Sequence, residues 1–360
     1  MDDRLLGLMS EMVERNASDL HLTAGSRPYY RVFGQLEPTD VEVESPADLQ
    51  ALIYSILNEE QQKRLEQDKE LDCSVGIAGE GRFRVNVFYQ RGSVAAAIRR
   101  LPYDIPSFEE LGLPVHIMKS LCHKPRGMVL VTGPTGSGKS TTLAAMIDYI
   151  NQTSANRIIC VEDPIEYLHG HKESLVSQRE LGQDTHSFAD ALRHVLRQDP
   201  DVVQIGEMRD LETIRSMLTV AETGHLAFST LHTSTAPTTI NRIVDVFPHE
   251  QQEQVRVQLS FELEAVVSQQ LLPARDGKGV VLAYETMIVN PAIRNLIREG
   301  EIDQIYSQMQ IGGGTGMVTM NASLAELVLA GRINEDTAKS KCSDVKELTR
   351  LLEHRASMEV

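Results

Sequence analysis

Residues 133–141 read Gly-Pro-Thr-Gly-Ser-Gly-Lys-Ser-Thr, and this stretch decides the fold that we expect for the chain. It matches the Walker A pattern GxxxxGK[ST], in which glycines let a loop turn its backbone N–H groups towards phosphate oxygens. An apolar run at 128–132 precedes it and a helical pattern at 142–149 follows it. This context disfavours the alternative, a glycine-rich turn that binds nothing. The stretch therefore predicts a nucleotide-phosphate site on a strand–loop–helix unit.

The motif predicts ATP and Mg²⁺ as cofactors. Lys139 offers a positive charge to the transferred phosphoryl group, and the Ser140 hydroxyl is placed to bind Mg²⁺. The dipole of the following helix favours the anion. The residues expected to contact the nucleotide are Gly133, Pro134, Thr135, Gly136, Ser137, Gly138, Lys139, Ser140 and Thr141.

Two further apolar runs end in carboxylates that could complete a hydrolytic site. The run 202–207 ends at Glu207, which we expect to hold Mg²⁺ through water, although Gly206 stands where many ATPases have Asp. The run 157–161 leads into the acidic cluster 162–166, where Glu166 could orient or deprotonate the attacking water. Alternatively, Glu207 is a surface residue at a strand end and the cluster is a solvated turn.

Two histidines flank the apolar run 226–231. His225 and His232 are seven residues apart, which puts them on opposite faces of a regular strand and argues against a shared metal. Each could hydrogen-bond a phosphate or report on the nucleotide, or could be a structural hydrogen-bonding residue.

Outside the motif, continuous apolar runs at 128–132, 157–161, 202–205 and 226–230 predict parallel strands buried on both faces. The first 100 residues mix helical and alternating patterns, with one helical segment expected over 46–65. Pro102 and Pro106 then indicate a linker.

Composition limits the class of protein. The net charge of −16 disfavours nucleic acid as the main partner, because such binding depends on Lys and Arg. No run approaches the roughly 18 apolar residues of a membrane helix, and the N-terminus does not match a signal peptide, so we expect a cytoplasmic protein without direct membrane insertion. The four cysteines lack the spacing of a zinc site or a disulfide framework: Cys73, Cys122, Cys160 and Cys342.

In this order and spacing, the motifs resemble the secretion-ATPase superfamily, and within it the PilT-type pilus retraction ATPases. Residues 162–166 look like its aspartate box, 197–210 its Walker B segment and 224–233 its histidine box, while 17–22 look like the opening of its N-terminal domain. The resemblance implies that Glu166 is the catalytic glutamate and Glu207 the Walker B carboxylate. It also implies that His225 and His232 are the histidine-box residues.

The resemblance implies an α/β fold with four parts. These are a PAS-like α+β N-terminal domain (1–100), a linker (101–115), a RecA-like P-loop ATPase core (116–290) and a helical C-terminal region (291–360). It also implies a homohexamer with ATP between subunits, where arginines of a neighbour's N-terminal domain meet the γ-phosphate. The candidates, each of which could instead be a surface or interface charge, are Arg82, Arg84, Arg91 and Arg99.

The most discriminating stretch resembles the AIRNLIRE motif of the retraction subfamily: Ala292, Ile293, Arg294, Asn295, Leu296, Ile297, Arg298 and Glu299. As a helix it would turn Ile293, Leu296 and Ile297 inward and expose Arg294 and Arg298 together.

Taken together, the motifs and the resemblance imply a motor that hydrolyses Mg-ATP and powers pilus retraction in twitching motility. They imply peripheral association with the inner membrane at the pilus base. The implied partners are an inner-membrane platform protein and a paralogous pilus ATPase. Three alternatives remain: a pilus assembly or type II secretion ATPase, an accessory retraction paralogue, and a nucleic-acid translocase. The missing tetracysteine zinc site disfavours the first.

Overall fold

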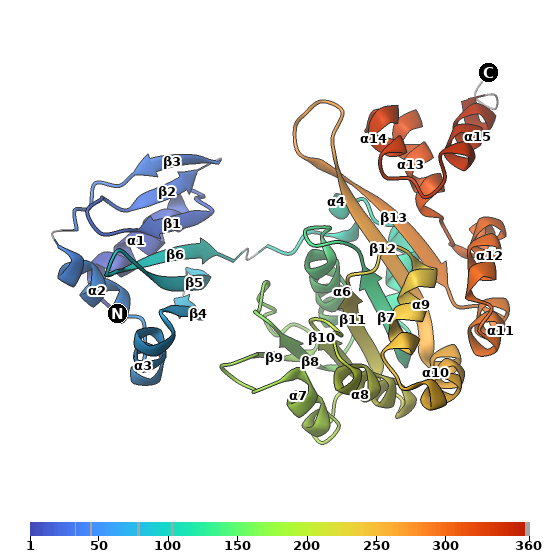
Figure 1. Ribbon diagram of the computed structural model, residues 1–360, viewed down its shortest axis with the longest axis horizontal. Coiled ribbons are helices and arrows are strands. Elements are labelled where there is room, and N and C mark those ends of the chain that lie inside the picture. The colour runs from blue at the N-terminus through green and yellow to red at the C-terminus, as the bar shows by residue number, and fades with distance from the viewer. Residues whose placement is uncertain (33, 44, 78–79, 102–103, 357–360) are drawn as a thin grey trace. The chain divides into compact units, whose positions relative to one another are not determined.

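The computed structural model describes residues 1–32, 34–43, 45–77, 80–101 and 104–356. Internal contacts divide the chain into two units, Met1–Asp104 and Ile105–Val360, and each is described by itself (Figure 1). Within the predicted linker 101–115, Pro102 and Tyr103 lie outside the described residues. None of the helices in the described part of the chain combines the length and the apolar character needed to cross a membrane.

The first unit is a six-stranded antiparallel sheet in the order β3-β2-β1-β6-β5-β4, with helices packed on its apolar face. Its elements are α1 (Asp3–Glu14), β1 (Asp19–Leu22), β2 (Tyr29–Val32), β3 (Gln35–Pro38), α2 (Pro46–Tyr54), α3 (Glu59–Asp68), β4 (Glu70–Ile77), β5 (Gly81–Gln90) and β6 (Ser93–Arg100). Alternation along β5 defines the faces of the sheet. Phe83, Val85 and Val87 are fully buried, while Arg82 and Arg84 lie on the opposite face.

The helical segment expected over 46–65 is two helices, α2 and α3, instead of one. A capping box at Asn58 starts the second helix, since the Asn58 side chain accepts from Gln61 N and the Gln61 side chain accepts from Asn58 N. Such a box satisfies the free N–H groups of a helix start, so it favours a new helix over continuation of the old one.

The second unit is built on a seven-stranded sheet in the order β13-β12-β7-β11-β10-β8-β9, parallel except for the β12–β13 pair. Its strands are β7 (Gly127–Thr132), β8 (Arg157–Glu162), β9 (Leu175–Glu180), β10 (Val202–Ile205), β11 (Leu226–Leu231), β12 (Leu263–Pro273) and β13 (Val280–Ile288). The four strands predicted from continuous apolar runs are confirmed as β7, β8, β10 and β11.

Helices cover both faces of this sheet and continue as far as Ala356. They are α4 (Phe108–Leu111), α5 (Val115–Cys122), α6 (Lys139–Thr153), α7 (Phe188–Val195), α8 (Leu211–Glu222), α9 (Ala236–Asp245), α10 (His249–Glu262), α11 (Pro291–Glu299), α12 (Ile305–Ile311), α13 (Met320–Leu329), α14 (Glu335–Lys339) and α15 (Val345–Ala356), with 3₁₀ turns at η1 (Ile302–Gln304) and η2 (Gly313–Thr315). Part of segment 101–115 is packed into this unit, because Phe108 is buried with its ring 5.6 Å from that of Tyr149.

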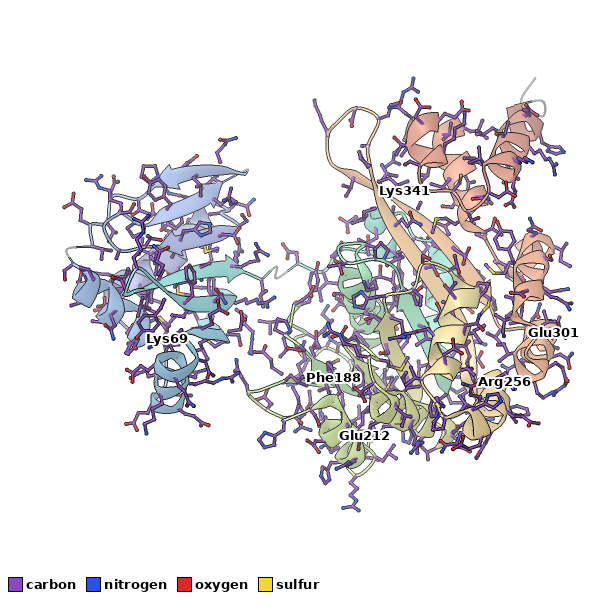
Figure 2. The ribbon with its side chains drawn as sticks, viewed as in Figure 1. Lys69, Phe188, Glu212, Arg256, Glu301 and Lys341 are labelled. Atoms are coloured by element: carbon purple, nitrogen blue, oxygen red, sulfur yellow. The ribbon has the colours of Figure 1, made fainter. Side chains whose placement is uncertain are left out.

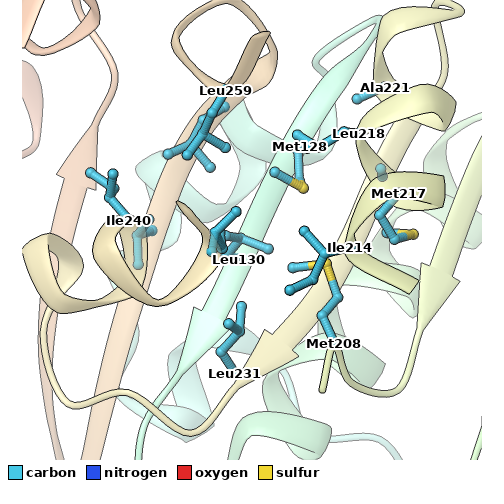
Figure 3. Close-up of a cluster of buried hydrophobic side chains, with 14 of the residues drawn as sticks. Met128, Leu130, Met208, Ile214, Met217, Leu218, Ala221, Leu231, Ile240 and Leu259 are labelled. Carbon is cyan, nitrogen blue, oxygen red and sulfur yellow. The ribbon is translucent and has the colours of Figure 1, made fainter. Parts of the chain in front are cut away.

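The central strand β7 explains why the runs are continuously apolar. Met128 and Leu130 belong to the cluster under α8 to α11, and Val129 and Val131 to the cluster under α4 to α6. Figure 3 shows Met128 and Leu130 near Ile214 of α8. Because successive side chains point to opposite faces, a strand with helices on both sides buries every residue.

Candidate active site

A polar cavity lies at the carboxyl ends of β7, β8, β10 and β11 in the second unit. Parallel strands bring these ends to one edge of the sheet, where ligands of open α/β sheets bind. The cavity is lined by Thr135, Gly136, Lys139, Ser140, Leu143, Ala144, Glu162, Asp163, Pro164, Glu166, His169, Phe188, Gln204, Gly206, Glu207, Arg209, Thr230 and His232.

The loop between β7 and α6 needs glycine for two different reasons. Gly136 and Gly138 have φ of 77° and 88°, which L side chains adopt only with strain. Gly133 has φ of 144°, and a Cβ there would lie 2.3 Å from Gln269 O and 2.5 Å from Ser137 Oγ. These positions let the loop wrap around the space in front of α6, as a phosphate-binding loop does.

Lys139 folds back over this loop. Its Nζ donates to Gly133 O at 2.9 Å and to Pro134 O at 3.0 Å. Burial lowers the pKa of Lys139, while the negative charges of Glu207 and Glu166 act to raise it. Since both carboxylates act on one ammonium group, the predicted phosphate ligand and the two predicted catalytic carboxylates share one electrostatic environment.

Glu207 is held by two cationic or donor groups at the floor of the cavity. Its Oε1 lies 2.6 Å from Arg209 Nε, and its Oε2 accepts from His232 Nε2 at 3.1 Å. Thr230 Oγ1 donates to Gly206 O at 2.7 Å, which ties the strand end to β11. The ring of Phe188, at the start of α7 (Figure 2), lies 3.6 Å from where a Cβ on Gly206 would sit. Sequence reasoning did not single out Arg209, although it follows Glu207 by two residues.

The acidic segment after β8 brings a second carboxylate to the cavity. Glu166 is exposed and lines it. Glu162 lies deeper, and burial raises its pKa to about 7. Tyr167, which sequence reasoning missed, places its hydroxyl 3.0 Å from Thr141 Oγ1 and so joins this segment to the P-loop helix. Only its position beside Glu166 could have drawn attention to it.

The structure brings part of the P-loop to the cavity, together with Glu166, Glu207 and His232. Of the nine motif residues, the cavity lining contains Thr135, Gly136, Lys139 and Ser140. Gly133, Pro134, Ser137 and Gly138 shape the loop, and the Thr141 hydroxyl contacts Tyr167 rather than the cavity.

The two histidines are separated. His232 lines the cavity, whereas His225 precedes β11 and lines a different cavity with Cys122 and Asp201. A strand rises about 3.3 Å per residue, so seven residues span about 23 Å. His225 Nδ1 lies 3.1 Å from both Val220 O and Thr223 Oγ1. The structure therefore does not bring His225 to the nucleotide cavity of its own chain.

The four predicted arginines belong to the first unit. Arg84 and Arg99 are register partners on β5 and β6, and Arg82 lies two residues from Arg84. Arg99 Nε lies 2.8 Å from Asp19 Oδ1, and Arg84 Nη2 lies 3.8 Å from Asp72 Oδ1. Arg82 Nη2 donates to Ser74 Oγ at 2.5 Å. Arg91 occupies the β5–β6 turn with a φ of 49°.

The stretch 292–299 forms α11, with Ile293 and Ile297 fully buried and Leu296 packed against the same core. The expectation that Arg294 is exposed alongside Arg298 is wrong. Arg294 Nη1 donates to the carbonyls of Ser260 and Phe261 at 2.9 and 2.7 Å, and Nη2 lies 3.0 Å from Glu264 Oε1. The free carbonyls at the end of α10 draw the guanidinium inward.

The residues present fit a magnesium ion. Ser140 and Glu207 offer oxygen donors at the cavity, and oxygen is the ligand that Mg²⁺ prefers. Within the described part of the chain, no group of three or more His, Cys, Asp or Glu could hold a metal. Such an ion would therefore take its remaining ligands from phosphate oxygens and water, as is usual for Mg²⁺ with nucleotides.

Comparisons with known proteins agree with this site. The model of the type II/IV secretion system protein family matches residues 3–290. The type IV pilus retraction ATPase PilT of Pseudomonas aeruginosa is 49% identical over 334 residues, covering 93% of this chain and 96% of PilT. The type IV pilus ATPase PilU of that organism is 41% identical over 341 residues, covering 95% and 89%.

A crystal structure of the pilus retraction motor PilT with bound ADP superposes with a TM-score of 0.89 at 55% identity, covering 96% of this chain and 98% of that one. The resemblance to the PilT-type ATPases expected from the motifs is thereby confirmed. The chain belongs to the type II/IV secretion system protein family.

Proposed function

We propose that this chain is an ATPase motor that hydrolyses Mg-ATP to power retraction of type IV pili and so supports twitching motility. The observation that carries the proposal is the single cavity shared by Lys139 of the P-loop, Glu207 after β10 and Glu166 after β8. A relative that is 49% identical over nearly the whole chain is a pilus retraction ATPase.

The geometry supports a division of labour among these residues. Lys139 exchanges the carbonyls of Gly133 and Pro134 for phosphate oxygens when nucleotide enters. Ser140 and Glu207 would hold Mg²⁺, Glu207 through water, and the ion would supply positive charge to the phosphate oxygens. Glu166, exposed at the cavity, orients the attacking water and accepts its proton.

Glu207 also offers a route for sensing the nucleotide. Its carboxylate contacts Arg209 and His232, and His232 directly follows β11, four residues before α9 begins at Ala236. When the contacts of Glu207 change with the bound nucleotide, its hydrogen bond to His232 changes as well. The sensing histidine in this proposal is His232, with His225 assigned no contact to the nucleotide of its own chain.

We further propose a homohexamer in which each nucleotide is also contacted by a neighbouring subunit. Arg82, Arg84 and Arg99, gathered on one face of the antiparallel sheet, support a role for the first unit as the source of these contacts, with Arg91 as a fourth candidate. In this assignment residues 1–100 are a PAS-like domain, 101–115 a linker, 116–290 a RecA-like core and 291–360 a helical region.

We also propose the partners that the resemblance to pilus retraction ATPases implies. They are an inner-membrane platform protein of the pilus and a paralogous pilus ATPase, with the ring held peripherally at the cytoplasmic face of the inner membrane. A second candidate function is that of an accessory retraction ATPase, since the chain is also 41% identical to a further type IV pilus ATPase, PilU.

Steady-state hydrolysis by the purified chain tests the enzymatic part. We expect Mg-dependent ATP turnover that falls at least 100-fold in Glu166→Gln. We also expect no stimulation by single-stranded DNA or RNA. Turnover that is unaffected by Glu166→Gln would refute the assigned mechanism, and strong stimulation by nucleic acid would favour a translocase instead.

A further inference from the structure

The segment that carries Glu166 has no regular secondary structure of its own. After β8 ends at Glu162, residues 163–174 form neither helix nor strand before β9 begins at Leu175. No helical or sheet hydrogen bonds fix the backbone of such a segment. The position of a carboxylate on it therefore depends on the other hydrogen bonds that the backbone makes. The groups that bond the backbone next to Glu166 therefore determine where its carboxylate lies.

One side chain of β9 makes two bonds to this backbone and a third to the end of β8. Gln178 Nε2 donates to Glu162 Oε1 at 2.9 Å and to Tyr167 O at 2.7 Å. Gln178 Oε1 accepts from His169 N at 2.9 Å. The single amide thus uses both of its donor hydrogens and its acceptor to join the end of β8 to the backbone on the far side of Glu166.

A second side chain of β9 holds the near side. Glu180 Oε2 accepts from Ile165 N at 3.1 Å, and its Oε1 accepts from Gln183 Nε2 at 2.7 Å. Glu180 is 3% exposed, so its carboxylate is fixed within the protein. Gln178 and Glu180 are two residues apart and therefore point to the same face of β9.

These hydrogen bonds lie on both sides of Glu166 in the chain. Ile165 and Tyr167 are the neighbours of Glu166, and each has a main-chain group bonded to β9. The Tyr167 hydroxyl adds a contact to Thr141 on α6. Glu166 itself stays exposed to the cavity, so its backbone is fixed while its carboxylate is available to substrate.

We propose that Gln178 and Glu180 are positioning residues for hydrolysis, which hold the segment around Glu166 so that its carboxylate meets the attacking water. The inference rests on the catalytic role proposed for Glu166. Misplacement of a reacting group by about 1 Å can cost about 100-fold in rate, so loss of either anchor lowers turnover without removing any group that binds nucleotide.

The first measurement compares turnover with nucleotide affinity in the full-length protein. We expect Gln178→Ala to lower kcat about 10- to 100-fold and to change the Kd for ADP by less than about threefold. Glu180→Ala should act alike, whereas Glu180→Gln keeps an oxygen for Ile165 N and should retain most of the turnover. Ser177→Ala, on the opposite face of β9, is the matched control and should retain full turnover.

A double-mutant cycle separates positioning from general damage. If Gln178 acts through Glu166, Gln178→Ala lowers the residual turnover of Glu166→Ala by less than about twofold. Equal fold-losses in both backgrounds, or ADP affinity lost together with turnover, would overturn the inference. If Gln178→Ala does not fold, Gln178→Glu takes its place in these measurements. Glutamate has the same size as glutamine and keeps an oxygen for His169 N, but it lacks both donor hydrogens.

The two proposals fail in different ways. Full turnover in Glu166→Ala would remove the catalytic role of Glu166 itself. Turnover lost in Glu166→Ala but intact in Gln178→Ala and Glu180→Ala would leave that role standing and refute the positioning role.

Discussion

Replacing Arg294 by Ala should destabilise the second unit, because Arg294 joins α11 to the end of α10. The substitution removes two charged donors from the carbonyls of Ser260 and Phe261 and one partner from Glu264. Glu264 keeps Lys124 at 2.7 Å, so its charge is not left alone.

The magnitude follows from the number and the exposure of these bonds. A hydrogen bond to a charged group contributes about 1.5 to 3 kcal/mol, and three of them do not add fully. The Arg294 side chain is 30% exposed, so water replaces part of what is lost. We expect a loss of about 2 to 3 kcal/mol in the free energy of unfolding, and a melting temperature lower by about 4 to 12 °C.

Arg298→Ala is the matched control in the same helix. Its side chain is 44% exposed and its ion pair with Glu299 is on the surface, so we expect a change within about 0.5 kcal/mol. Differential scanning calorimetry of both variants measures the difference. Equal melting temperatures for Arg294→Ala and Arg298→Ala would refute the conclusion that Arg294 anchors α11 to α10.

Three further predictions concern the cavity. Gly133→Ala should weaken ADP binding at least tenfold in a fluorescent-nucleotide titration, because the added Cβ would meet Gln269 O and Ser137 Oγ; unchanged affinity would contradict the loop geometry. Glu207→Gln should keep ATP affinity within about threefold and lower turnover at least 100-fold, and a retained rate in the same coupled assay would remove Glu207 from the mechanism. Burial raises the pKa of Glu162 from 4.5 to about 7, so its contribution to stability is present below pH 4.5 and is lost as the pH rises to about 7. Between these pH values, the free energy of unfolding of nucleotide-free Glu162→Gln should therefore rise by up to about 3 kcal/mol relative to that of the wild-type chain, as measured by chemical denaturation. Parallel plots of unfolding free energy against pH for the two proteins would contradict this.

Features encoded by short stretches could be predicted from the sequence. The P-loop and the four buried parallel strands each depend on neighbouring residues, and the structure has them as expected. The run that was expected to end at Glu207 is strand only to Ile205, and Glu207 follows it at the cavity. The break between α2 and α3 was also readable in principle, because the capping box at Asn58 and Gln61 lies within four residues.

What the sequence did not reveal depends on partners distant in the chain. Arg294 turns inward because the end of α10, about 30 residues earlier, offers free carbonyls. Gln178 lies on a separate strand from the segment that it holds, and no local motif marks it. Arg209 and Tyr167 gain their roles from contacts to Glu207 and Thr141, which only the packed sheet edge brings near.

The most direct test of the central claim is made in cells. The gene is deleted and complemented with the wild-type chain or with Glu207→Ala, and surface pili are counted by electron microscopy while twitching is scored. We predict many pili and no twitching in the deletion, rescued by the wild-type chain and not by Glu207→Ala. Cells without pili would contradict retraction in favour of an assembly motor, and an unchanged surface with normal twitching would contradict a role as the main motor.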